Sequence, residues 1–105
     1  MTSEELNSRV FSECLGSVFQ LQVPGQDPIP LDLIDVSEKD NSPRLEQFSV
    51  IFRDPGRRYL PQAIYELDHE KLGRIELFLV PIGPDEEGMC FQACFNRFRK
   101  TAPAK

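Results

Sequence analysis

The chain of 105 residues has little of what most catalytic and metal sites require. It contains one histidine, three cysteines, two tyrosines and no tryptophan. Its longest unbroken apolar run spans residues 77–82, far short of the roughly 20 residues that a membrane-spanning helix needs. The sequence therefore predicts no transmembrane helix, and it lacks the aromatic residues that usually line a platform for sugars or bases.

Charge and cysteine usage narrow the possible partners and the compartment. The segment MTSEELNSRVF is acidic and polar where a signal peptide needs basic residues and an apolar block. An odd number of cysteines disfavours a disulfide scaffold, so we expect a cytoplasmic protein with reduced thiols. A net charge of −5 opposes binding to phosphate backbones, and nucleic acid is not an expected partner. We interpret two local basic groups as solvated loop or tail: Arg53 with Arg57 and Arg58, and Arg97 with Arg99 and Lys100.

The length fits a single domain, residues 1–105, which can fold without metals or disulfides. Thr2 and Glu5 have the spacing of a capping box and Gly16 supplies a stop, which predicts a helix over residues 3–15. A β-rich body over 17–97 and a flexible tail over 98–105 complete the prediction. The apolar stripe of the helix consists of Leu6, Val10, Phe11, Cys14 and Leu15.

After the helix the hydrophobic period changes from about 3.6 to two, which is typical of strands. Short segments rich in Pro, Gly and Asp separate the strands, and no further helix lies between them. This pattern predicts a mainly β fold, an antiparallel small barrel or sandwich of about six strands. The predicted strands cover residues 19–23, 31–36, 46–53, 62–67, 74–80 and 89–96.

Most predicted strands carry their large apolar residues on one face. The strand over 74–80 differs because its opposite face carries Phe78 and Val80, beside Ile64 and Ile51 on neighbouring strands. We expect either the N-terminal helix or a partner subunit to cover this second apolar face. The predicted core consists of Phe48, Val50, Phe52, Ala63, Tyr65, Leu67, Ile75, Leu77, Leu79, Met89, Phe91, Ala93 and Phe95.

The histidine and cysteines, the residues best suited to catalysis or metal binding, are not spaced for either role. His69 lies in DHEKLG, between two strand patterns, and we interpret it as a residue of a solvated hairpin tip that donates to turn carbonyls, with Gly73 in a left-handed conformation. Cys90 and Cys94 would stand about 13 Å apart on a strand at about 3.4 Å per residue, too far for one zinc ion. Cys14 is expected in the buried stripe of the helix. The sequence also lacks the motifs of nucleophile elbows, phosphate loops, zinc helices and dinucleotide sites.

The segments FSECLGSVFQL, EQFSVIFRDP and LPQAIYELDHEKLGRIELFLVPIGPDEEGMCFQACFN together resemble a family of small bacterial all-β domains of unknown function. The resemblance spans residues 11–96. Ala63 stands where the family often has glycine, and Phe91 replaces a tyrosine. The family has no assigned catalytic residues that could be carried over, and the resemblance implies a structural or accessory domain, sometimes associated with phage-tail-like or tail-collar-like proteins.

We therefore predict a non-enzymatic structural or protein-interaction module without catalytic, cofactor or metal residues, which binds a protein partner or associates with itself. The candidate partner surface contains Arg53, Arg57, Arg58, Phe78 and Val80. The alternative is a β-barrel that binds a small apolar ligand, which eight interior-filling phenylalanines disfavour. A cysteine-dependent hydrolase would require Cys90 or Cys94 to be exposed and activated near His69.

Overall fold

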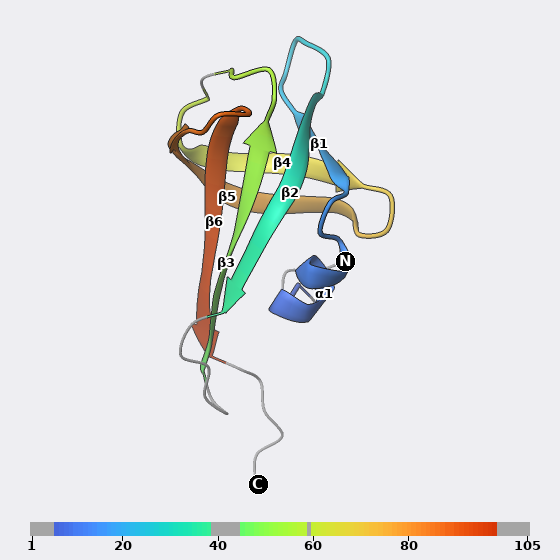
Figure 1. Ribbon diagram of the computed structural model, residues 1–105. Helices are drawn as coiled ribbons and strands as arrows, with labels where there is room; N and C mark the ends of the chain where they lie inside the picture. The colour runs from blue at the N-terminus through green and yellow to red at the C-terminus, as the bar shows by residue number, and fades with distance from the viewer. Residues whose placement is uncertain (1–5, 39–44, 59, 99–105) are drawn as a thin grey trace, which may run out of the picture.

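The chain forms one short helix followed by six strands (Figure 1). The computed structural model describes residues 6–38, 45–58 and 60–98, without the side chains of residues 45, 46, 97 and 98. The prediction of a mainly β chain with one N-terminal helix is confirmed. The elements are α1 (Ser8–Glu13), β1 (Val18–Gln22), β2 (Ile29–Glu38), β3 (Leu45–Asp54), β4 (Ala63–His69), β5 (Gly73–Pro84) and β6 (Met89–Phe98).

The six strands form a closed antiparallel barrel in the order β1-β2-β3-β6-β5-β4. Of the two predicted architectures, the barrel is therefore the observed one. In Figure 1, β4 and β5 run across the direction of β2, β3 and β6. A closed barrel gives every strand one inward and one outward face, which is the physical reason for the two-residue period of the sequence.

Strand β5 is longer than predicted because it continues through two prolines. Its pairing with β6 includes Pro81 and Pro84, and the register shifts between Pro81 and Gly83. A proline cannot donate to the sheet, and a local bulge accommodates this loss where a regular ladder would not. The segment predicted as a loop from residue 81 therefore still belongs to the barrel as far as Pro84. Strand β6 includes Phe98, and the rest of the predicted tail lies outside the described residues.

The helix is shorter than predicted. It begins after Asn7, whose side-chain oxygen accepts from the Val10 N–H at 2.9 Å, and it ends at Glu13. The predicted cap at Thr2 lies outside the described residues, and the cap of α1 is Asn7. Leu15, predicted in the buried stripe, is 48% exposed because the helix has ended before it.

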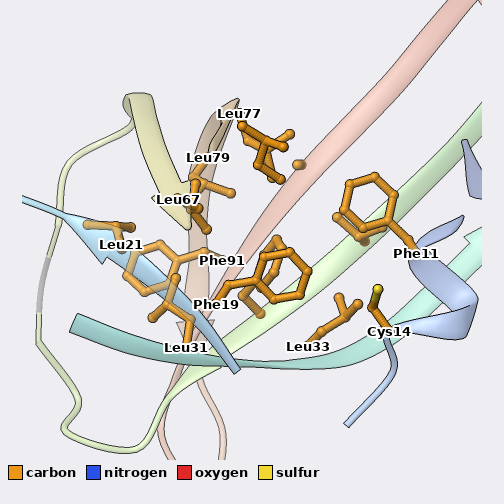
Figure 2. Packing of buried hydrophobic residues seen from close by; sticks show 14 of the residues in the cluster. Phe11, Cys14, Phe19, Leu21, Leu31, Leu33, Leu67, Leu77, Leu79 and Phe91 are labelled. Carbon is orange, nitrogen blue, oxygen red and sulfur yellow. The ribbon is translucent and has the colours of Figure 1, made fainter. Parts of the chain in front are cut away.

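The barrel interior is filled by aromatic and aliphatic side chains (Figure 2). Phe11 of α1 lies over one end of the interior, and its ring centroid is 6.4 Å from that of Phe19, 6.1 Å from that of Phe48 and 5.6 Å from that of Phe95. Phe19 in turn makes an edge contact with Phe52 at 5.1 Å. Aromatic pairs at these separations add attraction to the hydrophobic gain of burial. The helix thus closes the barrel with a phenylalanine side chain.

The predicted core residues all face inward, although Ala63, Tyr65, Met89 and Phe95 are half-buried. The predicted list was incomplete because it left out the first two strands, the helix and the β4–β5 turn. Apolar side chains from these segments fill the rest of the barrel interior. The added buried apolar residues are Leu6, Phe11, Cys14, Phe19, Leu21, Ile29, Leu31, Leu33 and Leu72.

Candidate functional site

The outer face of β4 and β5 carries the most prominent apolar pair of the described surface. Ile64 and Phe78 lie directly opposite each other in the β4–β5 register. Their exposed fractions are 68% and 51%. Their chain neighbours Ala63, Leu77 and Leu79 face the interior, so the strand geometry forces Ile64 and Phe78 outward. We call this pair and the two charged pairs beside it, Glu66 with Glu76 and Asp68 with Arg74, the β4–β5 face.

Charged residues border the apolar pair. The next outward pair along the strands is Glu66 with Glu76, and the one after it is Asp68 with Arg74. Arg74 donates to Glu66 Oε1 at 3.0 Å and to both oxygens of Asp68, one of them at 3.0 Å. These hydrogen bonds lower the pKa of Asp68 and raise that of Arg74. Within the described chain, no cation is paired with Glu76.

Two open grooves lie along this face. The first, about 570 Å³, is lined by Leu6 and Ile75 in addition to the face residues. The second, about 580 Å³, continues past Tyr65 to the end of β1 and the turn that follows it, Gln22 to Pro24. Both grooves share Ile64, Glu66, Arg74 and Glu76, whereas Phe78 lines only the first.

The helix does not cover the β4–β5 face, contrary to one of the two expectations. It packs against β2 and β3, and Figure 1 shows it below β4 and β5, beside the lower part of β2. Phe11 packs at the barrel end, so the helix does not cover Phe78, which stays exposed. Val80 is half-buried, and Ile51 is not on a neighbouring strand as expected, because β6 places Gln92 between them. The second apolar face is therefore narrower than the sequence predicted and centres on Ile64 and Phe78.

Arg53, which the sequence placed in the partner surface, is held by acidic residues of the β5–β6 connection. It donates to Asp85 Oδ2 at 3.0 and 2.6 Å and forms an ion pair with Glu87 at 3.0 Å. The Arg53 guanidinium holds the pKa of the Asp85 carboxyl well below its usual range. Arg53 therefore links the end of β3 to the β5–β6 connection and lies apart from the apolar pair.

Arg57 and Arg58 also hold a loop together. The carboxylate of Asp54 is fully buried and accepts from the Gly56 N–H at 2.8 Å, the Arg58 N–H at 3.1 Å and Arg58 Nη1 at 2.8 Å. Arg57 donates to the carbonyl of Glu86 at 2.8 Å. The three arginines fasten the chain after β3, and the structure does not bring them together with Phe78 and Val80.

His69 lies at the end of β4, buried rather than solvated as expected from the sequence. Its Nδ1 accepts from the backbone N–H groups of Lys71 at 3.0 Å and Leu72 at 3.3 Å, so it fixes the β4–β5 turn as an acceptor, not as the predicted donor. Gly73 has the predicted positive φ, 73°. The imidazole also lies 4.3 Å, centroid to centroid, from the ring of Phe19. Burial lowers the pKa of His69, which favours the neutral ring.

His69 has a side-chain partner, Ser17, that no pattern in the sequence indicated. Ser17 Oγ is 2.8 Å from His69 Nε2, a distance found in nucleophile–base pairs. Because Nδ1 is an acceptor, however, the single proton of the neutral ring must reside on Nε2, which donates to Ser17. Ser17 in turn donates to the carbonyl of Cys14. A base that activates Ser17 would need an unprotonated Nε2, so this pair is arranged to join two turns rather than to generate a nucleophile.

The cysteines stand as the strand pattern predicted. Cys90 and Cys94 lie on one strand, β6, and Cys14 belongs to the buried core next to α1. All three are free thiols. Burial raises the pKa of both the Cys14 and Cys90 thiols, and a hydrogen bond to Asp85 raises the pKa of Cys90 further. A raised pKa reduces the thiolate fraction that a nucleophile requires.

Residues 6–38, 45–58 and 60–98 contain neither a candidate metal centre nor a candidate membrane-spanning helix. Among them, no group of three or more His, Cys, Asp or Glu side chains is placed to hold a metal ion. No helix in these ranges has the length and apolar character required to cross a membrane.

Comparison with known proteins assigns the barrel to a family. The model of a family described as a domain of unknown function, DUF6916, matches residues 6–95. Searches among curated proteins and among solved structures found no match. The matched segment includes α1, the first five strands and most of β6. The chain therefore belongs to the DUF6916 family of domains of unknown function.

Proposed function

We propose that this domain is a non-enzymatic protein-interaction module and that the β4–β5 face is its contact surface. The observation that carries the proposal is the exposure of Ile64 and Phe78, which stand opposite each other on adjacent strands. An exposed aromatic next to an exposed aliphatic residue, between grooves and bordered by charges, has the composition of an interface centre with a polar rim. Phenylalanine is among the residues enriched at the centres of protein interfaces, where a few side chains carry most of the binding energy.

The environments of the buried cysteines and of His69 support a role without catalysis. The buried thiols have raised pKa values, and the imidazole of His69 is committed to backbone groups and to Ser17. The alternative of a barrel that encloses an apolar ligand is not favoured, because phenylalanine and leucine side chains fill the barrel interior. An accessory role in a phage-tail-like assembly, implied by the resemblance, remains a prediction within this proposal.

The test compares partner capture by immobilised wild-type domain and by three single variants. Phe78→Ser and Ile64→Ser remove the apolar pair, and Leu15→Ser is the matched control, an exposed apolar residue at 48% on the α1–β1 connection. All three substitutions are at the surface, where stability changes are usually within about 0.5 kcal/mol. We expect proteins from the source cell to be retained by wild type and Leu15→Ser and lost by the other two. Equal retention by all four forms would contradict the assignment of the surface.

A further inference from the structure

The apolar pair on the β4–β5 face is accompanied by a charge imbalance that indicates the chemistry of the partner. We propose that the partner is an extended protein segment in which an apolar side chain contacts Ile64 and Phe78 and a nearby lysine or arginine pairs with Glu76. This inference rests on the proposed function and specifies what the contact surface recognises.

The charges of the β4–β5 face do not balance within the chain. Glu66 and Glu76 lie directly opposite each other, an arrangement of like charges that destabilises a strand pair. Arg74 bonds to Glu66 and Asp68, so one guanidinium serves two carboxylates. Three carboxylates and one guanidinium leave an excess of two negative charges on the face. A cation from a partner at Glu76 would relieve the repulsion and complete the ion pairing.

The same charges argue against a second copy and against nucleic acid. In a symmetric dimer the identical patch meets itself, which would place one excess of negative charge against another. The net charge of −5 of the whole chain adds to this repulsion. Phosphate backbones carry the same sign as the face and would be repelled in the same way. A basic and apolar protein segment is the partner whose charge and polarity both match.

The shape of the face favours an extended segment. Strand β1 pairs with β4 only from Gln20 to Gln22, opposite residues 66–68 of β4. The chain then leaves the sheet at Val23 and Pro24, so residues 63–65 of β4 extend beyond the end of β1. The groove at this position is lined by apolar Val23, Pro24 and Ile64, by acidic Glu66 and Glu76, and by Arg74, which is already paired with Glu66 and Asp68. A strand-like segment along β4 would reach both the apolar and the acidic residues.

A library of random linear eight-residue peptides, displayed and selected on the immobilised domain, tests this inference. We expect selected peptides to be enriched in sequences with an apolar residue close to Lys or Arg. Resynthesised peptides should bind Glu76→Gln about two- to fivefold more weakly than wild type, the range of an exposed ion pair. Their binding should also weaken as salt is raised. Glu86→Gln, an exposed acid on the β5–β6 connection, is the matched control and should bind like wild type.

The outcomes separate this inference from the proposed function. Selected peptides that fail to bind Phe78→Ser and Ile64→Ser, yet contain no excess of Lys or Arg and bind Glu76→Gln like wild type, would overturn the inference of a basic partner. That result would leave the assignment of the contact surface intact. A dimer of the wild-type domain that Phe78→Ser dissociates, measured by sedimentation, would overturn it in favour of a second copy. Selected peptides that bind every variant equally would overturn both proposals. Thermal unfolding of each variant verifies that the fold is retained.

Discussion

Protonation of His69 should make the stability of this domain depend on pH near neutrality. The ring is 6% exposed, and Nδ1 accepts from two backbone N–H groups while Nε2 donates to Ser17. A second proton can enter only at Nδ1, where it would face the N–H groups of Lys71 and Leu72. Burial accordingly lowers the pKa of His69 in the folded protein below its ordinary value of 6.5. His69 is the only histidine of the chain, so the effect is not masked by others.

The sign and the size of the effect follow from this lowered pKa. The unfolded chain binds the proton more tightly, so the contribution of His69 to stability is complete above pH 6.5 and is lost as the pH falls through the pKa of the folded protein. One pKa unit corresponds to about 1.4 kcal/mol, and because pH 5.5 lies one unit below the unfolded pKa, the loss at that pH cannot exceed about this value. For a domain of about this size, 1 kcal/mol corresponds to roughly 4–8 °C in Tm.

Urea unfolding measured at pH 7.5 and at pH 5.5 tests the prediction. His69→Gln is the matched variant, because its side chain retains an acceptor and a donor but does not titrate in this range. We expect wild type to lose stability from pH 7.5 to pH 5.5, by no more than about 1.4 kcal/mol, and His69→Gln to be less stable at pH 7.5 but nearly independent of pH. A wild-type stability that is flat over this range, or an equal pH dependence in the variant, would refute the reasoning.

Three further predictions concern the core, the β3 loop and the thiols. Phe11→Ala should reduce the free energy of unfolding by about 3–5 kcal/mol because it leaves a cavity in the aromatic cluster at the barrel end. Phe78→Ala, at an exposed residue, should change it by less than about 1 kcal/mol, and urea unfolding of both variants checks the difference. Asp54→Ala should lower it by about 2–3 kcal/mol because two backbone N–H groups lose a charged, buried acceptor. Arg58→Ala should lower it by less than about 1 kcal/mol, since the Arg58 side chain is half exposed, and equal effects of the two substitutions would contradict the assigned roles. In thiol labelling at pH 8, exposed Cys94 should react first and the buried thiols only on unfolding, so rapid labelling of Cys90 in the folded protein would be incompatible with its burial.

The strands could be predicted from the sequence because their signal is local. Alternating residues such as those from Phe48 to Phe52 bury one face only if the backbone is extended, and each strand predicted this way lies within about four residues of its observed ends. The helix was predicted less well because an apolar stripe does not reveal at which residues the helix begins and ends. The prediction left out Asn7, whose side chain accepts from the Val10 N–H and caps the helix.

The site depends on contacts that no local pattern contains. Ser17 and His69 are 52 positions apart, and they meet only because β1 closes the barrel against β4. Arg53 and Asp85 are 32 positions apart and are joined through the pairing of β3 with β6. Each residue looked like an ordinary loop or strand residue in the sequence, so their roles could not be predicted.

By itself, the sequence determined that both faces of β5 carry apolar residues, because the alternation of side chains is built into an extended chain. Only the tertiary structure decided which of the two faces is covered. Closure of the barrel encloses Leu77 and Leu79, and α1 packs at the barrel end rather than over the sheet. Phe78 and Ile64 are left in solvent, since a closed barrel has a single interior and each strand can turn only one face toward it.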